Sequence, residues 1–261
     1  MRQTFNYHTH TYRCKHAYGT DEEYIEAAIK AGYKILGFSD HAPYRDYPSE
    51  SSHMDWEQLD EYLSTITTLK DKYKDQIDIR IGFETEYFSF NHDERLELRN
   101  KVDYLLLGQH FQDPVGKTVS YFKQNSDEEI KEYGRSVCEA LDTRLFLYLA
   151  HPDVFMNRQT EFDETCKSVS HMICQKCVET GTPMEINVRG TYKGKKPFIN
   201  SNEQFYYPHR DFWKIASEYP VKVLFGVDAH HPNDLTDLNA IELGYNEIKD
   251  LNLDFIKEPL F

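Results

Sequence analysis

The sequence repeats one pattern about seven times, in which a short apolar stretch is followed by a longer stretch with helical spacing. The apolar stretches are residues 5–7, 33–39, 77–83, 104–108, 145–150, 184–187 and 221–227. Apolar runs of this length are typical of parallel strands that are buried on both faces. Because no low-complexity linker divides the chain, we predict that residues 1–261 form a single α/β domain, most economically a closed barrel.

The segments between the strands carry helix signals. Thr20 is a predicted N-cap with Glu23 three residues later, as in a capping box, and Gly32 is a natural helix stop. Gly181 ends another predicted helix in the same way. We therefore expect helices over residues 20–32, 56–69, 93–101, 127–141, 161–179, 209–218 and 235–251.

Residues that commonly bind metals recur at the ends of the predicted strands. His8 and His10 alternate on an extended segment, so both side chains point the same way and can bind one ion. The carboxyl ends of barrel strands meet at one rim, where active sites are built. The sequence thus predicts a metal centre at that rim, with the candidate ligands His8, His10, His16, His41, Glu84, His110, His151, Asp228 and His230.

The number and type of these ligands indicate the metals. A catalytic zinc-like ion usually takes three protein ligands, so nine candidates suit three ions. Imidazole with a few carboxylates fits Zn, Fe or Mn better than Ca or Mg. We expect three divalent transition metal ions as cofactors, and the sequence does not choose among Zn, Fe and Mn.

Charge and cysteine content limit the partners and the compartment. Thirty basic against 44 acidic residues give a formal charge of −14, which disfavours nucleic-acid polymers and anionic membranes but permits a small phosphorylated substrate. The start has no apolar signal region, and no run approaches the roughly 20 apolar residues of a membrane span. We expect a soluble, cytoplasmic protein of undetermined oligomeric state. Five cysteines without a disulfide framework fit a reducing compartment; Cys174 and Cys177 are predicted to pack in a helix, and Cys14 to be a bystander.

An ordered set of motifs along nearly the whole chain resembles the polymerase and histidinol phosphatase (PHP) superfamily. The motifs are His-x-His at 8–10, a later His16, Asp-His at 40–41, Gly-x-Glu at 82–84, Gln-His at 109–110, His-Pro-Asp at 151–153 and Asp-x-His at 228–230. The length, the His-Thr-His-Thr opening, Ser-Asp-His-Ala-Pro and Gly-Val-Asp-Ala-His are similar to the stand-alone histidinol-phosphate phosphatases of that superfamily. This resemblance implies a distorted (β/α)₇ TIM-like barrel with a trinuclear centre at the C-terminal ends of the strands.

The resemblance also implies how the ligands are shared. One ion would be bound by His8, His10, Glu84 and Asp228. Glu84 would bridge to a second ion held by His110 and His151, and the third would be held by His16, His41 and His230. Many relatives have Glu at the position of Asp40, so no role is assigned to it. The remaining histidines match no motif and are interpreted as surface or structural residues: His53, His92, His171, His209 and His231.

The implied activity is hydrolysis of L-histidinol phosphate to L-histidinol and phosphate, a step of histidine biosynthesis. A metal cluster lowers the pKa of bound water and neutralises phosphoryl oxygens, so a metal-bridging hydroxide is the predicted nucleophile. Guanidinium groups bind phosphate in a bidentate manner. Arg189, in an Asn-x-Arg element, and Arg158, seven residues after His151, resemble phosphate-binding arginines of relatives.

Loop residues near the predicted rim are candidates for the rest of the substrate pocket. The aromatic candidates for stacking on an imidazole are Tyr12, Tyr44, Phe88, Phe111 and Tyr192. Glu86 and Asp153 are the candidates for binding an ammonium group.

Two other functions fit the same motifs. One is a PHP-type phosphoesterase or phosphodiesterase that acts on nucleotides or nucleic-acid ends, although the charge of −14 disfavours polymers. The other is a regulatory or structural metal-binding module without catalysis. The complete set of candidate ligands disfavours that second alternative.

Overall fold

An eight-stranded, all-parallel sheet forms the centre of the fold in the computed structural model, which describes residues 3–49, 51–113, 119–199 and 202–261. Its strands are, in spatial order, β1 (Phe5–Asn6), β2 (Ile35–His41), β3 (Asp78–Thr85), β4 (Tyr104–Leu107), β5 (Tyr148–Leu149), β6 (Met184–Asn187), β9 (Lys222–Gly226) and β10 (Asp254–Phe255). A separate antiparallel pair joins β7 (Lys195–Lys196) to β8 (Gln204–Phe205). The expected α/β fold with a parallel sheet is confirmed.

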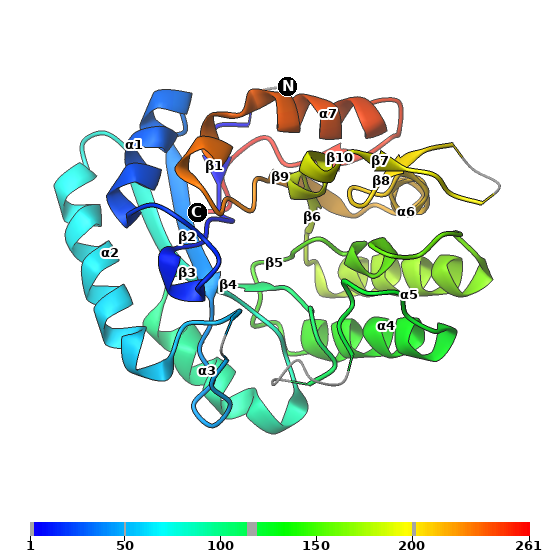
Figure 1. Ribbon diagram of the computed structural model, residues 1–261, viewed down its shortest axis with the longest axis horizontal. Helices are drawn as coiled ribbons and strands as arrows, with labels where there is room; N and C mark the ends of the chain where they lie inside the picture. The colour runs from blue at the N-terminus through cyan, green and yellow to red at the C-terminus, as the bar shows by residue number, and fades with distance from the viewer. Residues whose placement is uncertain (1–2, 50, 114–118, 200–201) are drawn as a thin grey trace.

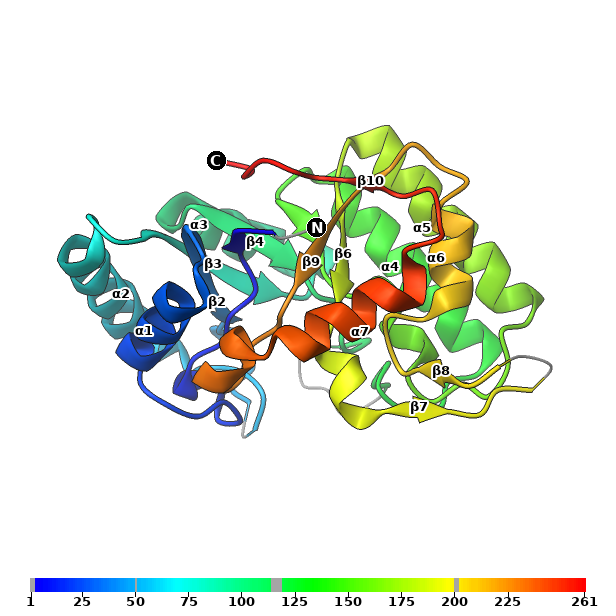
Figure 2. The same cartoon turned by 90° about the horizontal axis from the view of Figure 1, so that it is seen from above.

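Helices cover the outside of this sheet. They are α1 (Asp21–Ala31), α2 (Leu59–Tyr73), α3 (His92–Lys101), α4 (Asp127–Asp142), α5 (Glu164–Thr180), α6 (Arg210–Ala216) and α7 (Leu238–Ile248). Figure 1 shows α1, α2 and α3 on one side of the strands and α4, α5 and α6 on the other. The turned view in Figure 2 places α7 between these two groups. No helix in the described part of the chain is long and apolar enough to cross a membrane.

Local sequence signals explain several helix boundaries. The Thr20 hydroxyl accepts a hydrogen bond from the backbone N–H of Glu23, and the Glu23 carboxylate accepts one from the backbone N–H of Thr20, so the predicted capping box is confirmed. Gly32 and Gly181 end α1 and α5 in the left-handed conformation, with φ of 83° and 71°. The prediction over 235–251 is less accurate, because Pro232–Thr236 forms a 3-10 turn before α7 begins at Leu238.

The sheet has eight strands rather than the expected seven, because the two-residue strand β10 pairs with the first two residues of β9. This strand escaped sequence analysis because two residues carry no periodicity. The β7–β8 pair was missed for the same reason.

The two apolar clusters of the protein lie on opposite faces of the sheet. The larger one combines strand residues with buried side chains of the helices. The smaller one contains strand residues but none from a helix, so it fills the face that the helices leave uncovered. In it, the Tyr104 hydroxyl donates to the carbonyl oxygens of Tyr7 at 2.6 Å and Phe38 at 3.0 Å. Gly37 and Gly82 contact the Tyr104 ring, and a Cβ at either position would collide with it.

The first strand and β9 approach each other only near their carboxyl ends. There, Thr9 and Ala229 form a parallel bridge, in which His10 N donates to Ala229 O at 2.9 Å and Ala229 N to His8 O at 3.2 Å. Nearer the amino ends, side-chain amides take the place of a backbone ladder. Val227 N donates to Asn6 Oδ1 at 3.0 Å, and the Gln3 side-chain amide donates to Phe225 O at 2.7 Å and accepts from Phe225 N at 3.0 Å. We call this contact between the two strands the seam.

Replacing Asn6 tests whether its amide holds the seam. Asn6→Ala should lower the free energy of unfolding by about 2 kcal/mol, because the buried Val227 N–H loses its acceptor. Denaturant titration of the variant measures the loss. Asn252→Ala, at an exposed position, is the control and should change stability by less than about 0.5 kcal/mol. Equal effects of the two substitutions would contradict this account of the seam.

Candidate metal centre and active site

All nine candidate ligands meet at the carboxyl end of the sheet, in one cluster that draws on β2, β3 and the segments after β1, β4, β5 and β9. Eight of them are buried, and His16 is the exception. His151 and Asp228 have positive φ values of 27° and 53°, which are uncommon for residues other than glycine. Such strained backbone is found mainly at functional sites, where the surrounding structure maintains it.

Glu84 lies at the centre of the cluster, with its two oxygens facing different sets of imidazoles. Its Oε2 lies 3.3 Å from His8 Nε2 and 3.4 Å from His10 Nε2. His10 Nε2 is in turn 3.2 Å from Asp228 Oδ1. The four residues that sequence analysis grouped around a first ion are therefore neighbours.

The other Glu84 oxygen faces the residues grouped around a second ion. Glu84 Oε1 lies 2.8 Å from His151 Nε2 and 3.2 Å from His110 Nε2. The two imidazole nitrogens are 3.2 Å apart. Glu84 is thus placed to contact both groups at once, as a bridging ligand would.

The third group, His16, His41 and His230, forms a further set whose ligand atoms lie close enough to share an ion. His16 Nε2 and His230 Nε2 are 3.0 Å apart. Their Nδ1 atoms donate to the carbonyl oxygens of Cys14 at 2.8 Å and Asp228 at 3.0 Å, which leaves both Nε2 lone pairs directed into the site. His41 Nδ1 also lies 3.3 Å from Glu84, so His41 stands between two groups.

The electrostatics of the cluster favour cations. Burial raises the pKa of Glu84, but the nearby His110 and His8 outweigh it and hold the pKa well below its usual range. The same balance of burial against His8 and His10 lowers the pKa of Asp228. Both carboxylates therefore remain charged in a buried site.

The imidazoles of the third group are neutral, as metal ligands must be. Burial and the neighbouring His10 lower the pKa of His230 to about 3 and that of His41 well below its usual value. The buried atoms Asp228 Oδ1, His41 Nδ1 and His151 Nδ1 have no hydrogen-bond partner. Converging lone pairs beside two charged carboxylates fit divalent transition metal ions.

Three carboxylates outside the predicted ligand set contact imidazoles of the first and second groups. Glu185, on β6, lies 2.8 Å from His8 Nδ1, and Glu86 Oε1 lies 2.8 Å from His110 Nδ1. Asp40 Oδ1 is 3.4 Å from His10 Nδ1. Contacts of this kind orient a ligating ring and fix its tautomer. A carboxylate in the otherwise mainly apolar stretch 184–187 is unusual, and this position was the signal in the sequence that could have identified Glu185 as a site residue.

Glycines make room for two carboxylates of the site. A Cβ at Gly108 would collide with the Glu84 carboxyl group, and one at Gly226 would collide with that of Glu185. The absence of a side chain at Gly108, just after β4, and at Gly226, on β9, is therefore required by the acids beside them.

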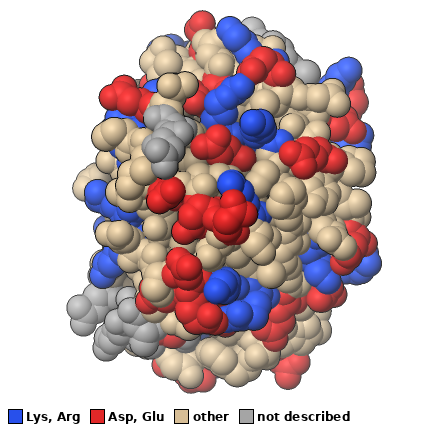
Figure 3. Space-filling model, turned by 90° about the vertical axis from the view of Figure 1, so that its right-hand side faces the viewer, with Lys and Arg blue, Asp and Glu red and all other residues tan. Residues whose placement is uncertain are grey.

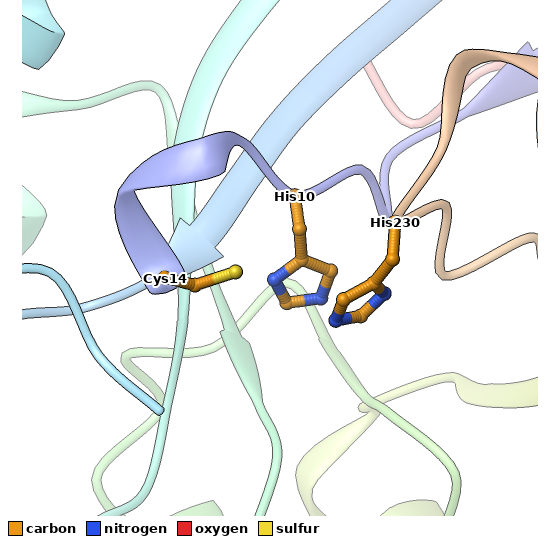
Figure 4. Close-up of side chains that lie close together, drawn as sticks. All are labelled: His10, Cys14 and His230. Carbon is orange, nitrogen blue, oxygen red and sulfur yellow. The ribbon is translucent and has the colours of Figure 1, made fainter. Parts of the chain in front are cut away.

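Cys14 lies beside the centre, on the 3-10 turn Tyr12–Cys14. Figure 4 shows its sulfur directed toward the His10 ring, with His230 on the other side of that ring. The rings of His10 and His230 stack with centroids 4.0 Å apart. Burial and the nearby Asp40 raise the pKa of the thiol far above its usual value, so Cys14 remains a neutral thiol.

A cavity of about 230 Å³ opens above the cluster. One wall is formed by Arg189, Lys193 and Tyr207. Arg189 Nη1 donates to Asp228 O at 3.1 Å, which places the guanidinium beside the candidate ligands. Arg158 is not among the residues that line this cavity; it is exposed and lies over the ring of Tyr206. Lys193 is a cation of the wall that sequence analysis did not identify.

Ser52, His53, Phe111 and Phe122 also line the cavity. His53, which sequence analysis interpreted as a surface or structural residue, is buried, lines the cavity, and lies 3.1 Å from the Glu86 carboxylate. No motif spacing marked it, because it belongs to an irregular loop.

The two candidates for binding an ammonium group are engaged elsewhere. Glu86 contacts His53, His110 and Tyr44. Asp153 is buried and accepts from the indole of Trp213 and the backbone of His209. Of the aromatic candidates, only Phe111 lines the cavity; Tyr12 and Tyr192 are exposed.

Comparisons with known proteins agree on one family. The model of the PHP domain family matches residues 6–251. The chain is 26% identical over 239 residues to a Deinococcus radiodurans protein named "Probable histidinol-phosphatase", covering 87% of this chain and 86% of that protein. It is 25% identical over 263 residues to the histidinol-phosphatase of Bacillus subtilis, covering 87% and 94%.

A solved structure shares the fold. Histidinol phosphate phosphatase from Lactococcus lactis, complexed with Zn, L-histidinol and phosphate, has a TM-score of 0.74 to this chain. The two are 18% identical, and the match covers 97% of this chain and 95% of that one. At this identity the likeness establishes the fold alone.

Glu185 offers a test of the support given to the candidate ligands. Glu185→Gln should lower metal affinity about 10- to 100-fold, because the ring of His8 loses the charged acceptor that orients it. Competition with a chromophoric chelator measures the affinity. Glu179→Gln, at an exposed position on α5, is the matched control and should not change it. An unchanged affinity in Glu185→Gln would rule out this role.

Proposed function

The chain belongs to the PHP domain family, and from this premise we propose that it is a metal-dependent phosphomonoesterase that hydrolyses L-histidinol phosphate to L-histidinol and phosphate. Its relatives include the histidinol-phosphatase of Bacillus subtilis. The observation that carries the proposal is the position of Arg189 on the wall of a cavity whose floor is the ligand cluster. A phosphate group in that cavity would meet a guanidinium and the metal-binding residues together.

We propose three ions, of Zn, Fe or Mn, in this centre. His8, His10, Glu84 and Asp228 would hold the first, Glu84, His110 and His151 the second, and His16, His41 and His230 the third. When bound, such ions lower the pKa of coordinated water and neutralise the charge of phosphoryl oxygens. The bridging position of Glu84 keeps two of the ligand groups at a fixed separation.

The protein's own residues orient the substrate. Arg189 binds the phosphate group and keeps its position through its bond to Asp228 O. The wall of His53, Phe111 and Phe122 receives the organic part of the ester, because its two phenylalanine rings offer apolar surface. Arg158, which is exposed outside the cavity, attracts the phosphate group by its positive charge.

Hydrolysis of nucleotides or nucleic-acid ends remains the second candidate function. The formal charge of −14 disfavours a polymeric anion. Figure 3 shows one face of the protein, on which acidic side chains are interspersed among basic ones. A small nucleotide is therefore the stronger form of this alternative.

Substrate preference decides between the two candidates. We expect kcat/KM for L-histidinol phosphate to exceed that for an aryl phosphate, a nucleoside monophosphate and an oligonucleotide. Release of inorganic phosphate, measured under matched metal loading, gives the comparison. A preference for the nucleoside monophosphate would favour the alternative, and equal values for all esters would refute the specific assignment.

Removing the bridging carboxylate tests the metal centre. Glu84→Gln should lose most of the activity and at least one equivalent of bound metal, because one side chain contacts both ligand groups. Metal analysis of the wild-type protein should find about three equivalents of transition metal. His92→Ala, outside the cluster, is the control and should retain both metal and activity. Fewer than about two equivalents in the wild type would contradict a trinuclear centre.

A further inference from the structure

Four cations gather at one edge of the cavity, in a chain whose formal charge is −14. Arg189 and Lys193 stand at the two ends of one 3-10 turn, Arg189–Lys193, that follows β6. The ring of Tyr206 lies 5.5 Å from Lys193 Nζ, 4.9 Å from Lys196 Nζ and 5.8 Å from Arg158 Cζ. A single aromatic ring therefore holds three cations close together.

Carboxylates neutralise only part of this group, because Arg189 Nη1 lies 3.5 Å from Asp234 Oδ2 while the other cations lack such a partner among the described residues. Within residues 3–49, 51–113, 119–199 and 202–261, neither Arg158 nor Lys193 forms an ion pair. The adjacent Lys195 differs, because its Nζ lies 2.6 Å from Glu247.

Burial and repulsion by neighbouring cations lower the pKa values of the two lysines Lys193 and Lys196. Burial, Arg158 and Arg189 lower the pKa of Lys193. Burial, Arg158 and Lys193 lower the pKa of Lys196 to about 8. An anion bound among these groups would relieve the repulsion, and a phosphate ester supplies that charge.

Lys196 explains how the group is held in place. Its Nζ donates to the carbonyl oxygens of Met156, Asn157 and Gln159 at 3.1, 2.7 and 2.9 Å. These residues surround Arg158 in the chain, so Lys196 fixes the segment that carries it. The ammonium group of Lys196 thus has three hydrogen-bond acceptors within the protein. Lys193, in contrast, lines the cavity without a polar partner among the described residues.

We propose that Lys193 is a phosphate-binding residue of this site, contacting the phosphate group of the substrate beside Arg189. This inference deepens the proposed function and rests on it, because the ligand is taken to be a phosphate ester. Lys193 supplies a point charge on a flexible stem, while Arg189 supplies a planar fork. The two cations at the ends of one turn act on the same group.

Inhibition by inorganic phosphate tests this assignment. Lys193→Met keeps the length of the side chain and removes its charge; we expect the inhibition constant of phosphate and the KM of the ester each to rise about tenfold. The metal content should stay at the wild-type value. Lys193→Arg should restore much of the phosphate affinity, which also shows that the position tolerates substitution.

Lys195→Met is the matched control, since Lys195 is the neighbouring lysine that is already paired with Glu247. It should change phosphate inhibition less than about twofold. Equal shifts in Lys193→Met and Lys195→Met, or a shift accompanied by loss of metal, would overturn the assignment.

The same measurements separate this inference from the proposed substrate. Phosphate inhibition can be followed with any ester that the protein hydrolyses. If L-histidinol phosphate is not preferred but phosphate affinity still depends on Lys193, the substrate assignment fails and the role of Lys193 stands. If L-histidinol phosphate is preferred and phosphate affinity is unchanged in Lys193→Met, the role of Lys193 fails alone.

Discussion

The buried carboxylate of Glu84 is the interaction on which the site depends. One oxygen faces His8, His10 and His41, and the other faces His110 and His151. A charged group in such a place is costly unless compensating charges surround it. The curled parallel sheet supplies them, because strands far apart in the chain end at one rim. Gly108 leaves the space that the carboxylate occupies.

Much of this arrangement was predictable from sequence, for physical reasons. Apolar runs followed by capped helices specify parallel β/α units, and the candidate ligands follow the runs directly, so their convergence could be derived without coordinates. His8 and His10 illustrate the point, since their spacing of two places both rings on one side of an extended segment. Their Nε2 atoms lie 3.1 Å apart.

What escaped prediction has a common physical cause. His53 and Tyr207 reach the cavity from irregular segments and Lys193 from a short 3-10 turn, whose paths are set by tertiary contacts rather than by periodicity. Glu86 and Asp153 looked equally suited to bind an amine in sequence. Only the fold shows that Glu86 contacts His110 and that Asp153 is buried beneath Trp213. The sequence pattern also does not distinguish Lys193, which lines the cavity, from Lys195, which forms an ion pair with Glu247.

The seam has a consequence for how the protein assembles. Asn6 and Val227 are separated by 221 positions along the chain, yet their contact completes the rim on which His8, His10 and Asp228 lie. Contacts of such long range carry a loop-closure cost, since the two ends of most of the chain must be brought together. A cation held by ligands from both sides of the seam would bind only when the seam is formed. Ion binding would therefore stabilise the contact between the first strand and β9.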